Sequence, residues 1–319
     1  MKPIKILFFS DTHLGFDYPL NPRVEKRRRG FDFFQHFRNI LNTAIREEYD
    51  LVIHGGDLFF RSKIPINIID MVYLDLFDFA KAGIPIFIVP GNHERSKLPD
   101  SLLISLPEIN IYDKPMTYTL EIQGKKICLS GFPFVKGNIR NSFPEILRKT
   151  NYTEQKGDLN LLIVHHPLDG ASVGPVNFTF RGREDTINPS EIPAQFHAVL
   201  AGHIHRRQIH EYNGTPIIFS GSIEKTSFAE MNETKGYVKL TFDDMLHYEF
   251  VDIPTRPMHI ITIPWEIEQN DVIPYLLDEI SLLDRNSIIR INMNGKKHIP
   301  ENRLRQLIPP TINIEQGFK

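Results

Sequence analysis

The sequence predicts a mixed α/β protein in which two β-sheets pack face to face as a sandwich, with helices on the outside and a small α/β domain at the C-terminus. Two observations predict it. In the first third of the chain, apolar runs alternate with segments of helical periodicity, which favours parallel strands joined by helices. Further along, strand-like runs are separated by tight-turn sequences, which favours antiparallel hairpins.

The first third of the chain has the order strand, helix, strand, helix, strand. The expected strands are Ile4–Phe9, Leu51–His54 and Pro85–Val89, and the expected helices run from about Phe31 to Glu48 and over Ile66–Lys81. In the first helix, apolar residues recur at the three- and four-residue spacing of one helical face. Gly83 fits the position just past the second helix, where glycine commonly ends a helix.

Three hairpins are expected in the middle of the chain, because pairs of strand-like runs flank short turn sequences. The paired runs are Met116–Ile122 with Lys126–Gly131, Gln208–Tyr212 with Pro216–Ser220, and Gly236–Phe242 with Leu246–Ile253. The second pair is joined by Asn213-Gly214, which is a strong signal for a two-residue turn.

A domain boundary is expected where Pro254 and Pro257 interrupt the strand pattern. It divides the chain into residues 1–254 and residues 255–319. The second part carries strand, helix and strand signals at His259–Ile263, Val272–Leu283 and Ser287–Met293. Because this part is small for an independent core, we expect it to pack on the main domain.

The composition excludes several classes of protein. A formal net charge of −2 excludes a uniformly basic nucleic-acid-binding protein, and no apolar run reaches the ~18 residues of a membrane span. The one cysteine, Cys128, cannot form an internal disulfide, which favours a reducing compartment. Since the first apolar run is too short for a signal peptide and ends in Asp11, we expect a soluble, cytoplasmic protein without a membrane partner.

Oxygen and imidazole side chains gather in five short segments, and four of the five directly follow an apolar, strand-like run. The segments are Asp11-Thr12-His13, Gly56-Asp57, Gly91-Asn92-His93-Glu94, His165-His166-Pro167 and Gly202-His203-Ile204-His205. Open α/β sheets place their sites at the carboxyl ends of strands. The recurrence of this pattern therefore predicts one pocket built from all five segments.

The segments supply a set of metal ligands made of two carboxylates, one amide oxygen and four imidazoles. The set is Asp11, His13, Asp57, Asn92, His165, His203 and His205. Seven ligands are too many for one ion but suit two neighbouring cations that share a carboxylate. Nitrogen and oxygen donors without thiolate fit Mn, Fe, Zn, Ni or Co and argue against a calcium cage. Each segment alone is more often an ordinary turn, so the prediction depends on the five together.

The five segments resemble the blocks of the calcineurin-like metallophosphoesterase superfamily. Within that match, three stretches resemble the Mre11/SbcD nuclease branch, which acts in DNA repair. They are Gly56–Phe59, Ser220–Phe228 and Pro254–Met258. The resemblance implies the two-sheet metallo-dependent phosphatase fold, followed by a small capping domain that helps to bind DNA. One departure is Phe60, at a position where that branch usually has a histidine that helps to orient the nucleic acid.

The resemblance also implies roles for the site residues. Asp11, His13, Asp57 and His205 would hold one ion, and Asp57, Asn92, His165 and His203 the other, with Mn²⁺ as the expected metal. His93 would be the catalytic residue that assists the leaving oxygen, and a metal-bound hydroxide would attack the phosphodiester. The implied activity is that of a DNA exonuclease or endonuclease.

Two other functions stay open at this point. One is a metallophosphoesterase of the same fold that acts on a small phosphodiester or nucleotide, and the other is a non-catalytic scaffold. DNA is the expected partner, and a Rad50/SbcC-like ATPase and a homodimer are further candidates. Family members that bind such an ATPase usually carry a further helical segment, for which we find no room before Lys319.

Basic residues near two of the segments are candidates for phosphate contacts. Arg27, Arg28 and Arg29 lie between the first segment and the first helix, and Arg206 directly follows the last segment. Arginine side chains commonly position a nucleic-acid backbone. The alternative is that these charges only form a solvated face or protect a strand edge.

Overall fold

The computed structural model describes residues 2–18, 29–102, 106–293, 301–309 and 311–317. Its first sheet has six strands. They are β1 (Ile4–Phe9), β2 (Leu51–His54), β3 (Ile86–Ile88), β4 (Ile109–Ile111), β13 (Lys235–Phe242) and β14 (Leu246–Ile253). Their order across the sheet is β14-β13-β1-β2-β3-β4. The strands from β1 to β4 pair in parallel, and β13 and β14 add an antiparallel hairpin beside β1.

The second sheet also has six strands and mixes parallel with antiparallel pairing. They are β5 (Met116–Ile122), β6 (Lys125–Gly131), β7 (Leu159–Val164), β10 (Ala198–Ala201), β11 (Gln208–Tyr212) and β12 (Thr215–Phe219). Their order is β11-β12-β10-β7-β6-β5, with parallel pairing in the centre and a hairpin at each edge. The three hairpins predicted from the sequence are all present.

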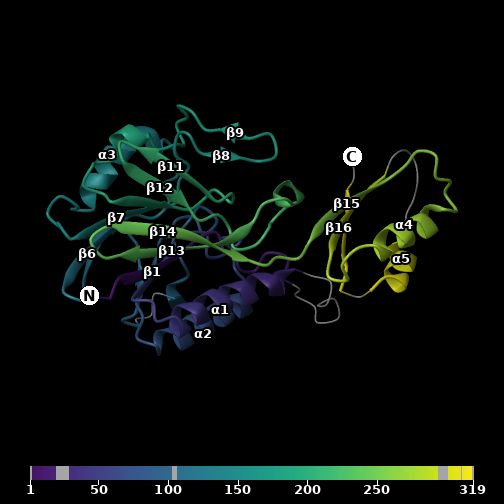
Figure 1. Ribbon diagram of the computed structural model, residues 1–319, viewed down its shortest axis with the longest axis horizontal. Coiled ribbons are helices and arrows are strands. Elements are labelled where there is room, and N and C mark those ends of the chain that lie inside the picture. Colours follow the sequence, from purple (N-terminus) through teal and green to yellow (C-terminus); the bar gives the residue numbers. More distant parts are fainter. Residues whose placement is uncertain (1, 19–28, 103–105, 294–300, 310, 318–319) are drawn as a thin grey trace.

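The two sheets face each other across an apolar core, and helices cover their outer faces (Figure 1). Successive side chains of β1 point to opposite faces of the sheet, so this strand contributes both to the core between the sheets and to the core beneath the helices. Ile6 and Phe8 join the core between the sheets, whereas Leu7 and Phe9 pack toward the helices. The covering helices are α1 (Gly30–Arg46) and α2 (Ile66–Ala80) on the first sheet and α3 (Ile139–Lys149) on the second. The predicted fold class is therefore confirmed.

The segment after residue 255 forms a third, smaller sheet with its own helices. Its strands are β15 (Met258–Ile263), β16 (Ile288–Met293) and β17 (Asn313–Gly317), and its helices are α4 (Val272–Ser281) and α5 (Glu301–Leu307). All three strands are parallel. An apolar cluster confined to this segment, with Ile263, Leu276 and Ile291 among its members, packs the helices on the sheet.

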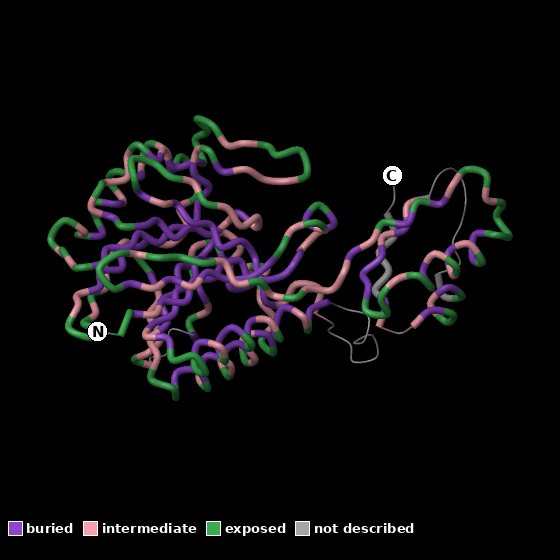
Figure 2. The backbone as a smooth tube through the Cα atoms, viewed as in Figure 1, coloured by how far each residue is buried: buried purple, intermediate pink, exposed green. Residues whose placement is uncertain are grey.

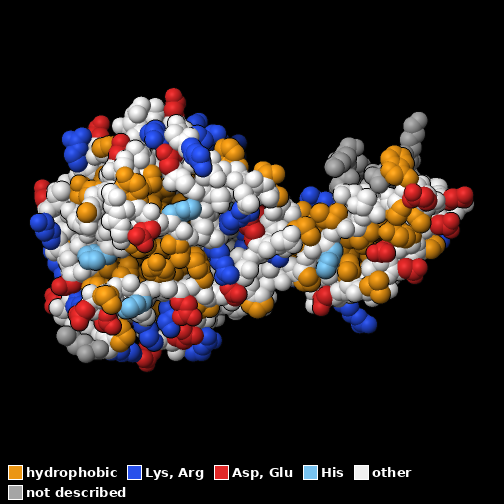
Figure 3. Space-filling view, turned by 45° about the horizontal axis from the view of Figure 1, so that its top comes forward, with side chains coloured by type: hydrophobic (Ala, Val, Ile, Leu, Met, Phe, Trp, Pro, Cys, Tyr) orange, Lys and Arg blue, Asp and Glu red, His pale blue; other side chains and the backbone are white. Residues whose placement is uncertain are grey.

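This smaller part extends from one end of the molecule and is joined to the rest by a narrow neck (Figures 1 and 3). Buried segments run through the centre of each part (Figure 2). We therefore retain, as a proposal, a division into domains at residues 254 and 255. None of the helices in the described ranges has the length and apolar character that crossing a membrane requires.

Several elements were not predicted from the sequence. They include α3, β4, β10, β17, α5 and a short hairpin of β8 (Ser172–Val173) and β9 (Phe178–Thr179). Helix α3 contains Pro144, which breaks the usual helix signal. In the described ranges, the remaining short elements are the 3₁₀ helices η2 (Asp100–Leu102), η3 (Pro189–Glu191) and η4 (Phe228–Glu230).

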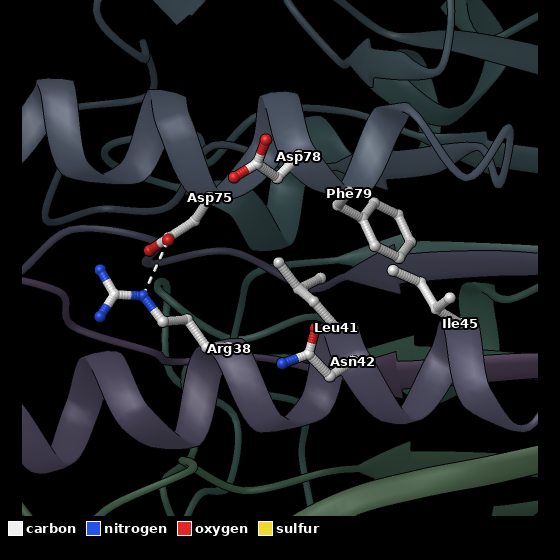
Figure 4. Close-up of a pocket in the computed structure, with 7 residues that line it drawn as sticks. All are labelled: Arg38, Leu41, Asn42, Ile45, Asp75, Asp78 and Phe79. Carbon is white, nitrogen blue, oxygen red and sulfur yellow. Dashed lines mark hydrogen bonds and ion pairs between the residues drawn. The ribbon is translucent and has the colours of Figure 1, made fainter.

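A shallow groove separates α1 from α2 on the outer side of the first sheet (Figure 4). Leu41 and Phe79 form part of its floor, and Arg38 pairs with Asp75 across it at 2.7 Å. Its lining contains no predicted metal ligand. The expected homodimer stays a prediction.

Candidate metal centre

Each of the five polar segments directly follows a central strand of one of the two sheets. The first three follow the neighbouring strands β1, β2 and β3, and the other two follow β7 and β10, which are also neighbours. The segment with His203 and His205 had no strand signal before it, and the structure supplies one in β10. Because the carboxyl ends of parallel strands meet at one edge, the segments converge at the same end of the two packed sheets.

The backbone of these segments is sharply turned. Asp11, His13, Asp57 and His203 all have positive φ angles, of 53°, 44°, 54° and 74°. Such angles are uncommon for residues other than glycine and collect at functional sites. Two backbone hydrogen bonds join the first two segments, from Asp11 N to Gly56 O and from His13 N to Asp57 O. The turned backbone thus brings the carboxylates and the imidazole of neighbouring strands together.

Close approach explains two glycines in the segments. A Cβ atom at Gly56 would lie 2.1 Å from Nδ1 of His165, and one at Gly91 would lie 2.1 Å from Oδ1 of Asp57. Neither distance is tolerable for a side chain. Glycine before Asp57 and before Asn92 is therefore required for the ligand side chains to reach one another.

A first group of donor atoms is formed by Asp11, His13 and His205. The Nε2 atoms of His13 and His205 are 2.8 Å apart, and Oδ1 of Asp11 is 4.0 Å from Nε2 of His205. Asp11 and His13 are completely buried. These donors come from distant parts of the sequence and from different sheets.

A second group surrounds Asn92 and Asp57. Oδ1 of Asn92 lies 2.8 Å from Nδ1 of His203 and 3.1 Å from Nε2 of His165. Oδ2 of Asp57 lies 3.2 Å from the same nitrogen of His165. Asp57 also belongs with His13 and His93, and with Asp11 and His165, in sets of donors that lie within 4.8 Å of one another. Its carboxylate therefore stands between the two groups.

The donor set fits two divalent cations. Ring nitrogens of His13 and His205 point at each other, and one amide oxygen meets two imidazoles, so the donors converge on common points. A histidine that binds a metal through one ring nitrogen usually donates the N–H of its other, outer nitrogen to an oxygen atom, which fixes the orientation of the ring. The Nδ1–H of His165 donates to Gly55 O at 2.7 Å, which leaves its Nε2 facing the centre. All seven predicted ligands are thus brought together.

Metal ligation needs ionised carboxylates and neutral imidazoles. Burial raises the pKa of Asp11. Burial would lower the pKa of His165, but the charge of Asp57 outweighs burial and raises this pKa to about 9. Three other groups, in contrast, are shifted toward the ligating state. Burial would raise the pKa of Asp57, but the charge of His165 and its hydrogen bond outweigh burial and lower this pKa. Burial lowers the pKa of His203 to about 3, and the neighbouring His165 adds to this effect. Burial, followed by the proximity of His205, likewise holds the pKa of His13 well below its usual range.

His93 lies beside the donor groups but is arranged differently from the ligands. Its Nδ1–H donates to the carbonyl oxygen of Phe60 at 2.5 Å, and its Nε2 faces Oδ2 of Asp57 at 3.8 Å. Its side chain is 35% exposed, whereas His165 is completely buried. The ring is therefore fixed at one nitrogen and accessible near the other, as a group that contacts a substrate requires.

Two carboxylates outside the predicted set of ligands support the centre. Glu94 accepts hydrogen bonds from the backbone N–H groups of Phe59 and Gly91, at 2.6 and 2.8 Å, and so ties two of the segments together. Burial raises the pKa of Glu94 to about 8. Glu230 meets Nδ1 of His205 at 3.1 Å. The only sequence signal for Glu94 was its place beside His93, and Glu230 had none.

The arginines predicted to bind substrate fall into two groups. Arg27 and Arg28 lie outside the described residues. Arg29 is only 2% exposed, and its guanidinium donates to the carbonyl oxygens of Lys225 and Thr226. These hydrogen bonds tie Arg29 to the loop that carries Lys225 and Thr226. They do not support the prediction that Arg29 contacts the substrate, which stays untested.

Arg206 is also bound within the protein. Its Nε pairs with Glu233 at 3.0 Å, and its two terminal nitrogens donate to Asn177 Oδ1 and Gly174 O at 2.7 Å each. Arg206 therefore anchors the β8–β9 hairpin. Its contact with a phosphate backbone stays a prediction. On the larger part in Figure 3, basic and acidic side chains are interspersed, whereas acidic side chains gather at the outer end of the smaller part.

Comparison with known proteins gives a consistent result. The model of the family described as calcineurin-like phosphoesterase matches residues 4–207. The DNA double-strand break repair protein Mre11 of Aeropyrum pernix is 26% identical over 277 residues, which cover 81% of this chain and 63% of that protein. The chain thus spans less than two thirds of the length of this relative. Mre11 of Saccharolobus solfataricus is 25% identical, over an alignment that covers 96% of this chain and 79% of that protein.

A bacterial relative and a solved structure extend the comparison. The SbcD component of the nuclease SbcCD from Staphylococcus epidermidis is 23% identical and aligns over 98% of this chain and 85% of its own length. A dimetal phosphatase from Danio rerio superposes with a TM-score of 0.52 at 11% identity. That superposition covers 78% of this chain and 96% of the phosphatase. At such low identity the structural likeness concerns the fold.

Proposed function

Because the chain belongs to the calcineurin-like phosphoesterase family, we propose that it is a two-metal phosphodiesterase that cleaves DNA. The observation that carries the proposal is the convergence of seven nitrogen and oxygen donors from both sheets on two neighbouring points. Relatives named as Mre11 and as the SbcD component of the nuclease SbcCD support DNA as the substrate. The predicted family is confirmed, and these findings support a metal-dependent phosphoester hydrolase.

The proposed assignment of ligands follows the two donor groups. Asp11, His13 and His205 would hold one cation, Asn92, His165 and His203 would hold the other, and Asp57 would contact both. Two such cations would supply neutralisation of the phosphoryl charge and activation of water at neutral pH. We keep Mn²⁺ as the proposed metal, and the donor set also suits Fe, Zn, Ni or Co.

His93 has the geometry of a group that transfers a proton to the leaving oxygen. The carbonyl oxygen of Phe60 holds the Nδ1–H, so Nε2 is directed toward the centre, where a phosphate would lie. In the protonated ring, Nε2–H can give its proton to the departing oxygen as the phosphodiester bond breaks. The backbone N–H of His93 donates to Asp57 Oδ1 at 2.9 Å, which fixes the distance between this ring and the proposed shared ligand.

A small phosphodiester or nucleotide is the second candidate substrate. Phe60 favours it, because the Mre11/SbcD branch usually has at this position a histidine that orients nucleic acid. The aromatic ring of Phe60 instead packs near His13 and His93, with centroids 6.1 and 5.7 Å away. A non-catalytic scaffold is disfavoured because all seven donors and His93 are in place. An SbcC-like ATPase partner and a cytoplasmic location are retained as parts of the proposal.

The test compares the wild-type protein with His93→Ala on end-labelled DNA in the presence of Mn²⁺. We expect the variant to retain its metals and to lose about 10²- to 10⁴-fold in turnover, the usual contribution of a positioned proton donor. His247→Ala serves as the matched control, because His247 is exposed on β14, outside the donor groups. Metal content is measured on all three proteins.

Three outcomes would contradict parts of the proposal. Absence of DNA cleavage together with rapid hydrolysis of bis-(p-nitrophenyl) phosphate would favour the small substrate. Equal cleavage by wild type and His93→Ala would remove His93 from the reaction. DNA binding that does not weaken with added salt would argue against contacts with the phosphate backbone.

A further inference from the structure

We propose that Glu230 is a positioning residue for His205, because its carboxylate selects the ring nitrogen that His205 presents to the metal centre. Oε1 of Glu230 lies 3.1 Å from Nδ1 of His205, on the side of the ring that faces away from the centre. On the inner side, Nε2 of His205 lies 2.8 Å from Nε2 of His13. This inference rests on the proposed function only in taking His205 as a metal ligand.

The selection follows from the chemistry of the two groups. An ionised carboxylate can only accept hydrogen bonds, so the Nδ1 atom that faces Glu230 must carry a proton. When the ring is neutral, its lone pair is then on Nε2, which is the nitrogen that faces Asp11 and His13. Without the carboxylate, the neutral ring could carry its proton on either nitrogen. A proton on Nε2 would leave this nitrogen without a lone pair for a metal ion.

Glu230 is itself held from several sides. The hydroxyl of Thr226 donates to Oε1 at 2.6 Å, and the ammonium of Lys235 donates to Oε2 at 2.6 Å. Lys235 is only 1% exposed and also donates to the carbonyl oxygen of His205 at 3.0 Å. The lysine therefore binds both the carboxylate and the backbone of the residue that the carboxylate orients.

The ionic character of this cluster needs an explanation beyond stability. A buried ion pair carries a desolvation cost, and apolar side chains of similar size often stabilise a fold equally well. Glu230 is 8% exposed and sits on the single turn of η4, just before β13 begins at Lys235. What an apolar residue could not provide at this place is an acceptor for the Nδ1–H of His205.

Other histidines of the centre are anchored differently. The outer nitrogens of His165 and His93 donate to the backbone carbonyl oxygens of Gly55 and Phe60. Among these three, only His205 has a side-chain carboxylate as its outer partner. A charged partner strengthens ligation more than a neutral one does, and the loss of such a partner typically lowers metal affinity about 10- to 100-fold.

The first experiment is calorimetric titration of the metal-free full chain with Mn²⁺. In Glu230→Ala we expect one of the two binding events to weaken about 10- to 100-fold, while the other keeps its affinity within about threefold. Glu230→Gln retains an oxygen that can accept from Nδ1–H, and we expect it to recover part of the loss. Glu233→Gln is the matched control, because it removes the other carboxylate that pairs with Lys235, at 3.1 Å.

A second measurement reads the protonation of the ring directly and needs neither metal nor DNA. Histidine ¹⁵N NMR of the metal-free protein, recorded at a pH at which the ring is neutral and assigned with His205→Gln, should show the proton of His205 on Nδ1 in the wild type. In Glu230→Ala we expect a mixture of the two protonated nitrogens. If Glu230→Ala does not fold, the double variant Glu230→Leu, Lys235→Met removes both buried charges together, leaves no acceptor for the Nδ1–H of His205, and is measured in its place.

The outcomes separate a positioning role from a structural one. Selective weakening of one Mn²⁺ site with a changed ring signal supports the proposal. Equal effects of Glu230→Ala and Glu233→Gln, or weakening of both sites with loss of folded structure, would overturn it, as would an unchanged ring signal. Because these readouts do not use DNA, absence of nuclease activity would contradict the proposed substrate and leave this result intact.

Discussion

At the scale of single residues, the centre depends on which atom of each side chain faces inward. The outer nitrogens of His93 and His165 donate to carbonyl oxygens, and that of His205 meets Glu230, so the Nε2 atoms face the cluster. His203 is turned the other way and presents Nδ1 to Asn92. The same residue type thus contributes different atoms, according to the partners that the surrounding loops provide.

Asp57 is the residue whose loss should affect the centre most. Since its carboxylate lies among the donors of both groups, Asp57→Ala removes one ligand from each proposed cation. Elemental analysis of metal-reconstituted protein should find about two equivalents per wild-type chain and well below one in the variant. The backbone of Asp57 has a positive φ, so Asp57→Asn, which tolerates that conformation better than alanine does, is measured beside it.

Normal metal content in both Asp57 variants would contradict the proposed shared ligand. A loss of metal in Asp57→Ala alone, with Asp57→Asn unchanged, would show that the charge of Asp57 is not required, because the asparagine amide keeps an oxygen that can bind a cation, as that of Asn92 is proposed to do. Circular dichroism of the metal-free proteins checks that both variants fold.

At the scale of elements, the site depends on loops that are tied to strands and helices by a few polar contacts. One such contact joins α3 to the loop after β7. Arg140 of α3 pairs with Oδ2 of Asp169 at 2.9 Å, and Thr186 and Gly182 donate to Oδ1 of the same residue at 2.8 and 2.9 Å. Burial would raise the pKa of Asp169, but these hydrogen bonds outweigh it and lower this pKa.

Asp169 should therefore contribute to stability in a way that depends on pH. A lowered pKa in the folded state means that the contribution is present above the ordinary aspartate pKa of about 4 and disappears as the pH falls through the folded value. At pH 7 we expect Asp169→Asn to lower the free energy of unfolding by about 1 kcal/mol. Below pH 4 the difference from wild type should shrink toward zero.

Urea unfolding at a series of pH values measures this difference. A penalty that stays constant down to pH 3 would mean that the charge of Asp169 is not what stabilises the loop. Asp158→Asn is a suitable control. Like Asp169, Asp158 accepts a backbone hydrogen bond, in this case from Lys126, but it lies at the exposed start of β7.

At the scale of the whole molecule, the smaller C-terminal part contacts the turn that carries Glu230. Phe228 on η4 packs with Met258 of β15 and Ile288 of β16, and the guanidinium of Arg290 lies 4.2 Å from the centre of its ring. Two residues further on, Glu230 meets His205. One short turn therefore contacts both the smaller part and a proposed metal ligand.

Phe228→Ala should consequently affect the centre although Phe228 is not one of the predicted ligands. Removing the ring leaves η4 less firmly held, and we expect a weakening of up to about tenfold at the proposed Mn²⁺ site that includes His205. Calorimetric titration measures it. Phe178→Ala is the control, because Phe178 is 47% exposed on β9 and lies away from this contact. Unchanged Mn²⁺ affinities in Phe228→Ala would show that the smaller part does not influence the centre.

The sequence by itself determined the parts of this protein that depend on local pattern. Alternation and apolar runs gave β1, β2 and the three hairpins, and helical spacing gave α1 and α2. The places of five of the seven candidate ligands were evident, because polar residues directly after a buried strand are conspicuous in the sequence. His203 and His205 were found through the resemblance of their segment to a family block. These features need only near neighbours along the chain.

Only the tertiary structure decided how the ligands meet and what supports them. The contact between Nε2 of His13 and Nε2 of His205 joins residues that are 192 positions apart. No local pattern specifies that distance, which follows from the packing of two sheets through one core. Glu94 and Glu230 escaped prediction for the same reason, since their importance lies in partners brought to them from other elements. Local periodicity fixes which face of an element is apolar, whereas packing fixes which polar atoms are left facing one another.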